Sequence, residues 1–246
     1  RGPISGGHQR ADRPVADRGV IGRNRNGRVA PLAERWSARW EQAREWMALG
    51  AVFIPVGERL LAQYSEPGRH YHDGRHVLAC LDALDNFPGT VRDNDAVEMA
   101  IWFHDAVYNP QAPPGKNETD SAALFRKEFE LLAGAQLDIG EVCRLILATR
   151  HDSEPDDGDA ALIVDIDLGV LGAEPARYDH YATEIRQEYE FVDDDAFRRG
   201  RSVVLSDFLA RKAIYFTRHF RKLLEKRARK NLSRELQSLN SAGSAK

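Results

Sequence analysis

Residues 97–108 read VEMAIWFHDAVY, and this stretch decides the fold class. It is an apolar run long enough for a helix, closed by Asn109-Pro110 and by a proline- and glycine-rich loop at 113–115. His104 and Asp105 stand near its end. The sequence therefore predicts a helix that presents two adjacent polar side chains where it stops.

Apolar residues at helical spacing continue on both sides of this run. The further segments that we expect to be helical are 32–64 with a break after it, 77–84, 118–133, 139–150, 175–192, 196–210 and 219–239. Only residues 161–164 are strand-like, and so short an apolar run suits a buried helix equally well. The pattern predicts one all-α domain over residues 32–240.

Local signals mark several helix starts. Asn117 and Asp138 each stand three residues before an acidic residue, in an arrangement that resembles a capping box. Pro175 suits the first turn of a helix. We expect Asp194 or Asp195 to cap the helix over 196–210.

Residues 1–31 differ in composition from the rest of the chain. Positions 1–30 hold six glycines, two prolines and no aromatic residue. Such a segment buries too little apolar surface to offset the loss of chain entropy, so we expect a disordered tail. Seven arginines against two aspartates give it a charge of +5, which leaves −8 for residues 31–246. The predicted domain therefore lacks the basic character of a nucleic-acid-binding protein, and we expect no such partner.

The composition favours a cytoplasmic protein. No apolar stretch approaches the roughly 18 residues that a membrane span needs, and no signal-peptide core precedes the domain. Cys80 and Cys143 both fall in apolar helical runs, where reduced core thiols are expected.

Histidines and aspartates gather at a few places in the chain. His70, His72 and His76 form one group, His104-Asp105 the second, and His151 follows later. Two aspartates at 165 and 167 lie inside the apolar stretch 162–171, where a carboxylate is costly to bury unless it is paired or binds a metal. Imidazole and carboxylate ligands together suit a divalent transition metal. If the helix that begins near His76 packs antiparallel to the one that ends at His104, these side chains converge.

The order of these residues resembles the H…HD…D signature of the HD superfamily of metal-dependent phosphohydrolases. The flanking sequence is similar to one subfamily of predicted HD phosphohydrolases in five segments, RHYHDGRH (69–76), AIWFHDAVY (100–108), NETDSA (117–122), ILATRH (146–151) and DIDLGVLG (165–172). The resemblance covers about residues 34–240 and implies an all-helical HD-type domain.

The resemblance also implies a ligand set of His76, His104, Asp105 and Asp167. Asp167 is preferred to Asp165 because the last aspartate of the family usually precedes a leucine. Asp165 stays open as the alternative, and the residue that is not the ligand is expected to support a ligand histidine. HD enzymes with two metals typically carry two further histidines between the HD pair and the last aspartate, whereas this sequence has only His151 there. The resemblance therefore implies one divalent ion (Mn, Fe, Co, Ni, Zn or Mg).

Further residues near these segments are candidates for catalysis and substrate binding. Glu118 is expected to orient or deprotonate the attacking water, although a glutamate is also favoured in a first helical turn by the helix dipole. His151 is the second catalytic candidate, and His72 is expected to contact substrate. Four basic residues flank the ligands and are candidates to hold phosphate oxygens, with Arg69 and Arg150 preferred over Arg75 and Lys116.

These residues together predict hydrolysis of a nucleotide or related small-molecule phosphoester by metal-activated water. The alternative is a non-catalytic HD module that binds a nucleotide or partner as a sensor. The sequence contains no phosphate-binding loop and no dinucleotide fingerprint, so it does not identify the substrate. It also leaves a homodimer open.

Overall fold

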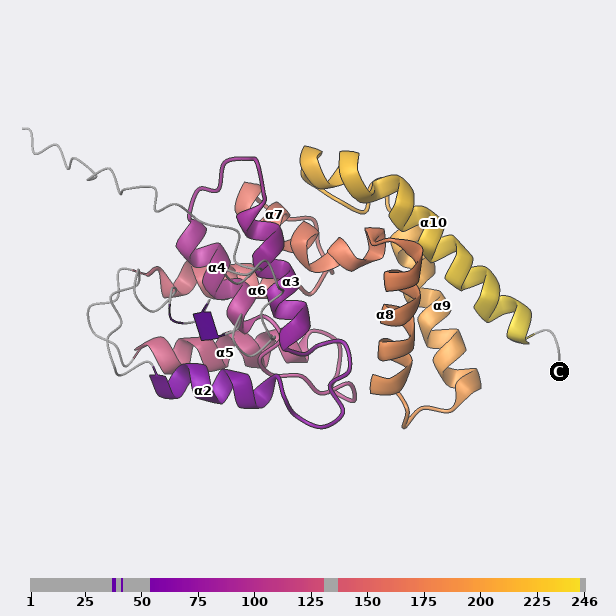
Figure 1. Ribbon diagram of the computed structural model, residues 1–246, viewed down its shortest axis with the longest axis horizontal. Helices are drawn as coiled ribbons and strands as arrows, with labels where there is room; N and C mark the ends of the chain where they lie inside the picture. Colours follow the sequence, from indigo (N-terminus) through magenta and orange to yellow (C-terminus); the bar gives the residue numbers. More distant parts are fainter. Residues whose placement is uncertain (1–36, 39–40, 42–53, 131–136, 244–246) are drawn as a thin grey trace, which may run out of the picture.

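The computed structural model describes residues 37–38, 41, 54–130 and 137–243. The predicted tail at 1–31 and most of the first predicted helical segment lie outside these residues. Throughout 54–130 and 137–243 the regular structure is helical, which confirms the all-α prediction (Figure 1). Its elements are α2 (Ile54–Gln63), α3 (Gly74–Asp85), α4 (Asn94–Phe103), α5 (Lys116–Glu130), α6 (Ile139–Ala148), α7 (Gly158–Asp167), the 3₁₀ helix η2 (Leu168–Gly172), α8 (Pro175–Glu188), α9 (Asp194–Ala210) and α10 (Arg218–Gly243).

Many of these helices have an aspartate as N-cap, whose side chain accepts a hydrogen bond from a backbone N–H of the first turn. The predicted cap Asp138 accepts from the N–H of Glu141, and Pro175 begins α8 as expected. The cap of α9 is Asp193, whose carboxylate accepts from the N–H of Ala196 at 2.8 Å. The prediction that Asp194 or Asp195 caps this helix was therefore wrong, because the cap precedes them.

Two other local predictions were also wrong. Asn117 does not cap α5 but lies inside it, and its side-chain amide binds both the N–H and the carbonyl of Asn109. The helix expected to run to Tyr108 ends at Phe103, and the chain then turns. The ambiguous segment 161–164 is helical and belongs to α7.

The central helix of the core is α4, whose residues 96–103 are all buried. Its last residue, Phe103, packs edge-on against Phe125 of α5, and Phe125 stacks on Phe129 with the ring centroids 4.3 Å apart. Cys80 and Cys143 are buried and form no disulfide, as expected of core thiols. Because α4 is enclosed, the residues that follow its end are held at a fixed place inside the protein.

The last three helices, α8, α9 and α10, stand together at one side of the molecule, and η2 connects them to the rest (Figure 1). The backbone of η2 approaches α10 closely at Gly172. A Cβ atom there would lie 2.5 Å from Leu224 Cβ and 3.0 Å from the Tyr215 hydroxyl, so only glycine fits without rearrangement. No helix among the described residues combines the length and the apolar character needed to cross a lipid bilayer.

Candidate metal centre

Four predicted ligands meet where three helices converge. His76 lies in the first turn of α3, which begins at the cap Asp73. His104 is the residue at which α4 ends, and Asp105 follows it. Asp167 is the last residue of α7. The start of α3 therefore meets the end of α4, as the antiparallel arrangement expected from the sequence requires.

One side-chain atom from each of these residues points to a common position, and these atoms all lie within 4.8 Å of one another. The Nε2 atoms of His76 and His104 are 3.1 Å apart. Asp105 Oδ2 is 3.0 Å from His104 Nε2, and Asp167 Oδ1 is 3.1 Å from His76 Nε2. Two donors that bind one ion at about 2.1 Å lie about 3.0 Å apart at a right angle and about 3.4 Å apart at the tetrahedral angle. The spacing of this group therefore suits one metal ion.

The hydrogen bonds around His104 favour a cation at this position. His104 Nδ1 lies 2.9 Å from the carbonyl oxygen of Ile101, and because a carbonyl only accepts, Nδ1 carries a proton. In the neutral ring Nε2 then holds a lone pair, which faces His76 and Asp105. Asp105 Oδ2 is buried and has no hydrogen-bond partner among the described residues. Converging lone pairs of this kind are stabilised by a cation, so the residues present fit a divalent metal.

The two carboxylates dominate the electrostatic environment of the cluster. Burial lowers the pKa of the His104 imidazole, but the carboxylates of Asp105 and Asp167 more than offset burial and raise it well above its usual value. Burial likewise favours the neutral form of Asp167, yet its contacts with His104, His151 and His76 hold its pKa well below the usual range. Two carboxylates that stay ionised in a buried site generate the negative potential that attracts a metal ion.

The two aspartates of α7 point in different directions, because residues two apart on a helix differ by about 200°. Asp165 is fully buried and accepts hydrogen bonds from the N–H groups of Phe216 and Thr217, both at 2.7 Å. It therefore fixes the segment before α10. The expectation that the aspartate outside the ligand set supports a histidine was wrong, because both oxygens of Asp165 face that segment.

His151 supports Asp167 from the side opposite the other histidines. Its Nε2 donates to Asp167 Oδ2 at 2.8 Å, while Asp167 Oδ1 faces the ligand cluster. The backbone of His151 has φ of 58°, a left-handed conformation uncommon for residues other than glycine, and Arg211 donates to its carbonyl at 2.7 Å. His151 Nδ1 is buried without a partner within the described part of the chain. In this backbone conformation Nε2 of His151 binds Asp167, and Nδ1 remains able to form a further hydrogen bond.

Glu118 and Arg150 also have buried polar atoms for which the described residues provide no partner, Glu118 Oε2 and Arg150 Nε. Burial raises the pKa of Glu118, and the charges of Asp105 and Asp167 add to the effect while His151 opposes it. The other end of the Arg150 guanidinium donates to Thr119 Oγ1 at 2.5 Å. Arg150 therefore lies against α5, at the residue that follows Glu118, and both side chains have capacity for a further hydrogen bond.

Arg69 has a different role from the one predicted. Its buried guanidinium donates to the carbonyl oxygens of Asp105 at 2.7 Å, Ala106 at 2.9 Å and His72 at 3.1 Å, and its Nε donates to Glu66. Four of its five N–H donors are thus bound within the protein, and the prediction that Arg69 binds substrate is not supported by this geometry. Arg69 instead holds the turn after α4 that carries Asp105.

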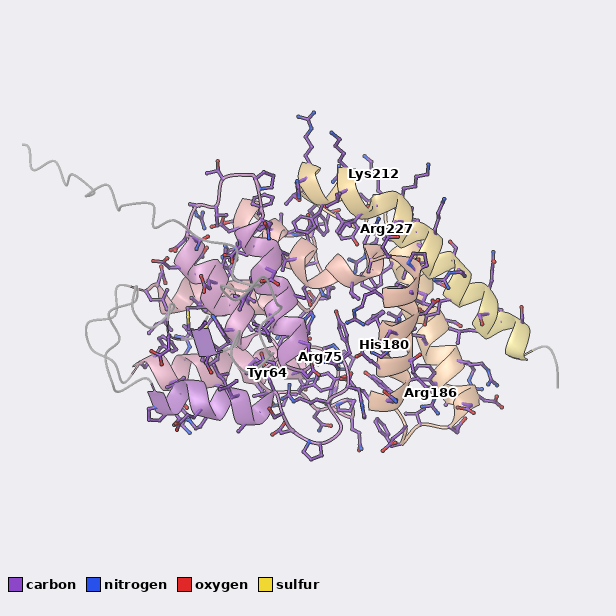
Figure 2. The ribbon with its side chains drawn as sticks, in the orientation of Figure 1. Tyr64, Arg75, His180, Arg186, Lys212 and Arg227 are labelled. Carbon is purple, nitrogen blue, oxygen red and sulfur yellow. The ribbon has the colours of Figure 1, made fainter. Side chains whose placement is uncertain are left out.

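Arg75 and Lys116 are also engaged elsewhere. Arg75 lies on the side of α3 that faces α8 (Figure 2), where it forms ion pairs with Asp73 at 2.8 Å and Glu184 at 2.9 Å. Lys116 pairs with Asp120 one turn along the exposed face of α5. Of the four basic candidates, only Arg150 keeps an unpartnered buried donor within the described residues.

Glu188, at the end of α8, organises the histidine-rich segment and was not found by sequence reasoning. Its Oε1 accepts from the N–H groups of His70, Tyr71 and His72 at 2.7 to 2.9 Å. Its Oε2 accepts from His72 Nδ1 at 2.7 Å and from the Tyr108 hydroxyl at 2.9 Å. Burial opposes ionisation, but these hydrogen bonds lower the pKa of Glu188 to about 2. The carboxylate orients the His72 ring, which stacks on Tyr108.

Comparison of the chain with models of protein families, with curated proteins and with solved structures found no match in any of the three.

Proposed function

We propose that this protein is a metal-dependent phosphohydrolase that acts on a nucleotide or related small-molecule phosphoester. The observation that carries the proposal is the group of four ligand atoms within 4.8 Å of one another, from His76, His104, Asp105 and Asp167. The sequence resemblance to HD-superfamily enzymes supports the same ligands and the reaction class. We propose one divalent ion per chain, Mn, Fe, Co, Ni, Zn or Mg.

The ligand set also favours chemistry over a purely structural metal. Structural sites are usually closed by protein ligands, commonly cysteines, whereas mixed histidine and carboxylate sites with positions left for water and substrate are typical of hydrolytic enzymes. A divalent ion in such a site polarises a phosphoryl oxygen and makes water a stronger nucleophile at neutral pH.

Three buried polar atoms without a partner among the described residues suit roles in phosphoester hydrolysis. They belong to Glu118, His151 and Arg150. Glu118 Oε2 is buried and its pKa is raised, which suits a group that accepts a proton from the attacking water. His151 donates from Nε2 to Asp167, so in its neutral ring Nδ1 has a lone pair. Nδ1 could take up a proton from solvent and pass it to the leaving-group oxygen. Arg150 Nε is a cationic donor able to hold a phosphoryl oxygen. Arg69 acts as a positioning residue through the backbone of Asp105.

Metal content tests the proposal first. The wild type is expected to hold about one transition metal per chain by elemental analysis, and the double variant His104→Ala/Asp105→Ala is expected to hold none, because two of four ligands are removed. His180→Ala serves as a matched control, since its side chain is 61% exposed and lies on α8 outside the ligand group. A double variant that stays loaded would refute the ligand assignment.

Turnover tests the chemistry separately. The loaded wild type is incubated with nucleoside mono-, di- and triphosphates, cyclic nucleotides and simple aryl phosphates, with each candidate metal in turn. Release of phosphate, or of a nucleoside monophosphate from a cyclic substrate, by the wild type and not by the double variant is the expected result. Metal and ligand binding without any turnover would favour the alternative, a non-catalytic sensor module.

A further inference from the structure

A cavity of about 150 Å³ opens beside the proposed metal centre. His72, His151 and the ligand Asp167 contribute polar side chains to its lining. Most of the remaining lining comes from apolar side chains of η2, α9 and α10, among them Leu168, Leu171, Leu205, Phe208 and Leu232, and from the rings of Tyr71 and Tyr181. The cavity therefore joins polar groups at the proposed metal centre to a mostly apolar wall.

Arg201, the one arginine among the lining residues, forms ion pairs and hydrogen bonds inside the protein. Arg201 donates to Glu235 from Nε at 2.8 Å and from a terminal nitrogen at 3.2 Å, and it also contacts the Tyr181 hydroxyl. Its charge is thus balanced inside the protein. A ligand group in the cavity meets leucine side chains and the ring of Phe208, whose centroid lies 6.3 Å from that of the His151 ring.

The volume limits the size of the occupant. An apolar cavity of about 150 Å³ binds a molecule of the size of benzene. The fused rings of a purine exceed this volume, and the lining residues include no Asn or Gln side chain to pair with the edge of a base. The occupant that fits is one uncharged ring or a branched chain of similar volume.

We propose that the preferred substrate is a phosphate ester whose organic group is compact, uncharged and apolar, such as an aryl group, and that this group occupies the cavity while the phosphate faces the metal ligands. This inference rests on the proposed phosphohydrolase function and narrows its substrate class. Specificity then depends on the α9 wall, where Val204 lies at the mouth of the cavity with 45% of its surface exposed.

The test uses phosphonates, which bind without being hydrolysed, and measures their affinities by calorimetry on the metal-loaded protein. Phenylphosphonate is expected to bind at least about tenfold more tightly than methylphosphonate, because its ring is buried as a core phenylalanine ring is. Val204→Trp places a large side chain at the mouth and is expected to abolish this preference with metal content unchanged. Val203→Trp is the matched control, since Val203 is the neighbouring residue of α9, is 59% exposed and does not line the cavity.

A second variant opens the cavity instead of closing it. Phe208→Ala is expected to shift the preference from phenylphosphonate toward 1-naphthylphosphonate. Equal affinities of the wild type for phenyl- and methylphosphonate, no binding of either, or a preference that survives in Val204→Trp would overturn the inference. Failure of the proposed function gives a different result, in which the phenyl preference is present but phenyl phosphate is not hydrolysed.

Discussion

Two single variants, Asp165→Asn and Asp167→Asn, distinguish a carboxylate that stabilises the fold from one that binds metal. Both residues lie on α7. Asp165→Asn retains one side-chain oxygen but turns an N–H₂ group toward a backbone N–H that the carboxylate satisfied at 2.7 Å. Loss of a charge-assisted hydrogen bond and burial of an unpaired donor together cost about 2 to 4 kcal/mol. In a chain of this size such a loss lowers the melting temperature by roughly 4 to 16 °C.

Metal binding is expected to respond in the opposite order. Asp165 faces Phe216 and Thr217, so Asp165→Asn should change metal affinity by less than the ~10 to 100-fold that substitutions next to a ligand produce. Asp167→Asn removes an anionic ligand and should empty the site. Both variants are purified, loaded with Mn²⁺, dialysed and measured by elemental analysis, and their unfolding is followed by circular dichroism. The reasoning is refuted if folded Asp165→Asn lacks metal or if Asp167→Asn keeps it.

Two further predictions concern stability. The pKa of about 2 for Glu188, against a usual value of 4.5, means that its contribution is complete above about pH 5 and is lost as pH falls toward 2. By acid titration of the free energy of unfolding, Glu188→Gln should therefore lose roughly 3 kcal/mol less than the wild type across this range, and equal losses would contradict the assignment. Gly172→Ala should destabilise the protein by about 1 to 3 kcal/mol in urea, because the new methyl group collides with Leu224, whereas Gly169→Ala, with no atom within 4 Å, should be tolerated. Equal stability of the two alanine variants would show that η2 can move away from α10.

Local sequence signals predicted the fold well where the chain itself determines the structure. The spacing of apolar residues located most of the described helices but left the segment of α7 open between strand and helix, and the cap at Asp138 was identified from its own neighbours. The same reasoning failed where distant residues compete. The helix expected to continue to Tyr108 stops at Phe103, and Arg69 binds the carbonyls of the turn that follows. Asn117 likewise binds Asn109 across the loop instead of capping its own helix.

The candidate site was likewise predicted in part, and the contacts made by distant residues were missed. Family resemblance and the cost of buried carboxylates pointed to the four residues that the structure brings together. Glu188 gave no sequence signal, because its partners precede it by 80 to 118 residues and nothing in its own neighbourhood marks it. The hydrogen bonds of Arg69 to backbone carbonyls could not be predicted either. In the sequence, an arginine that binds a substrate phosphate cannot be distinguished from one that binds backbone carbonyls.

The ligands of the candidate centre lie on α3, α4 and α7, between positions 76 and 167, so an ion bound there cross-links parts of the chain that are distant in sequence. The ion meets this arrangement only in the folded chain, and at one hundred times its dissociation constant it would add about 2.7 kcal/mol to stability. Without the ion this contribution is lost and the unfolded fraction rises. Unfolded chains are substrates for proteases, so the steady-state abundance of this protein is expected to follow the metal supply of the cell.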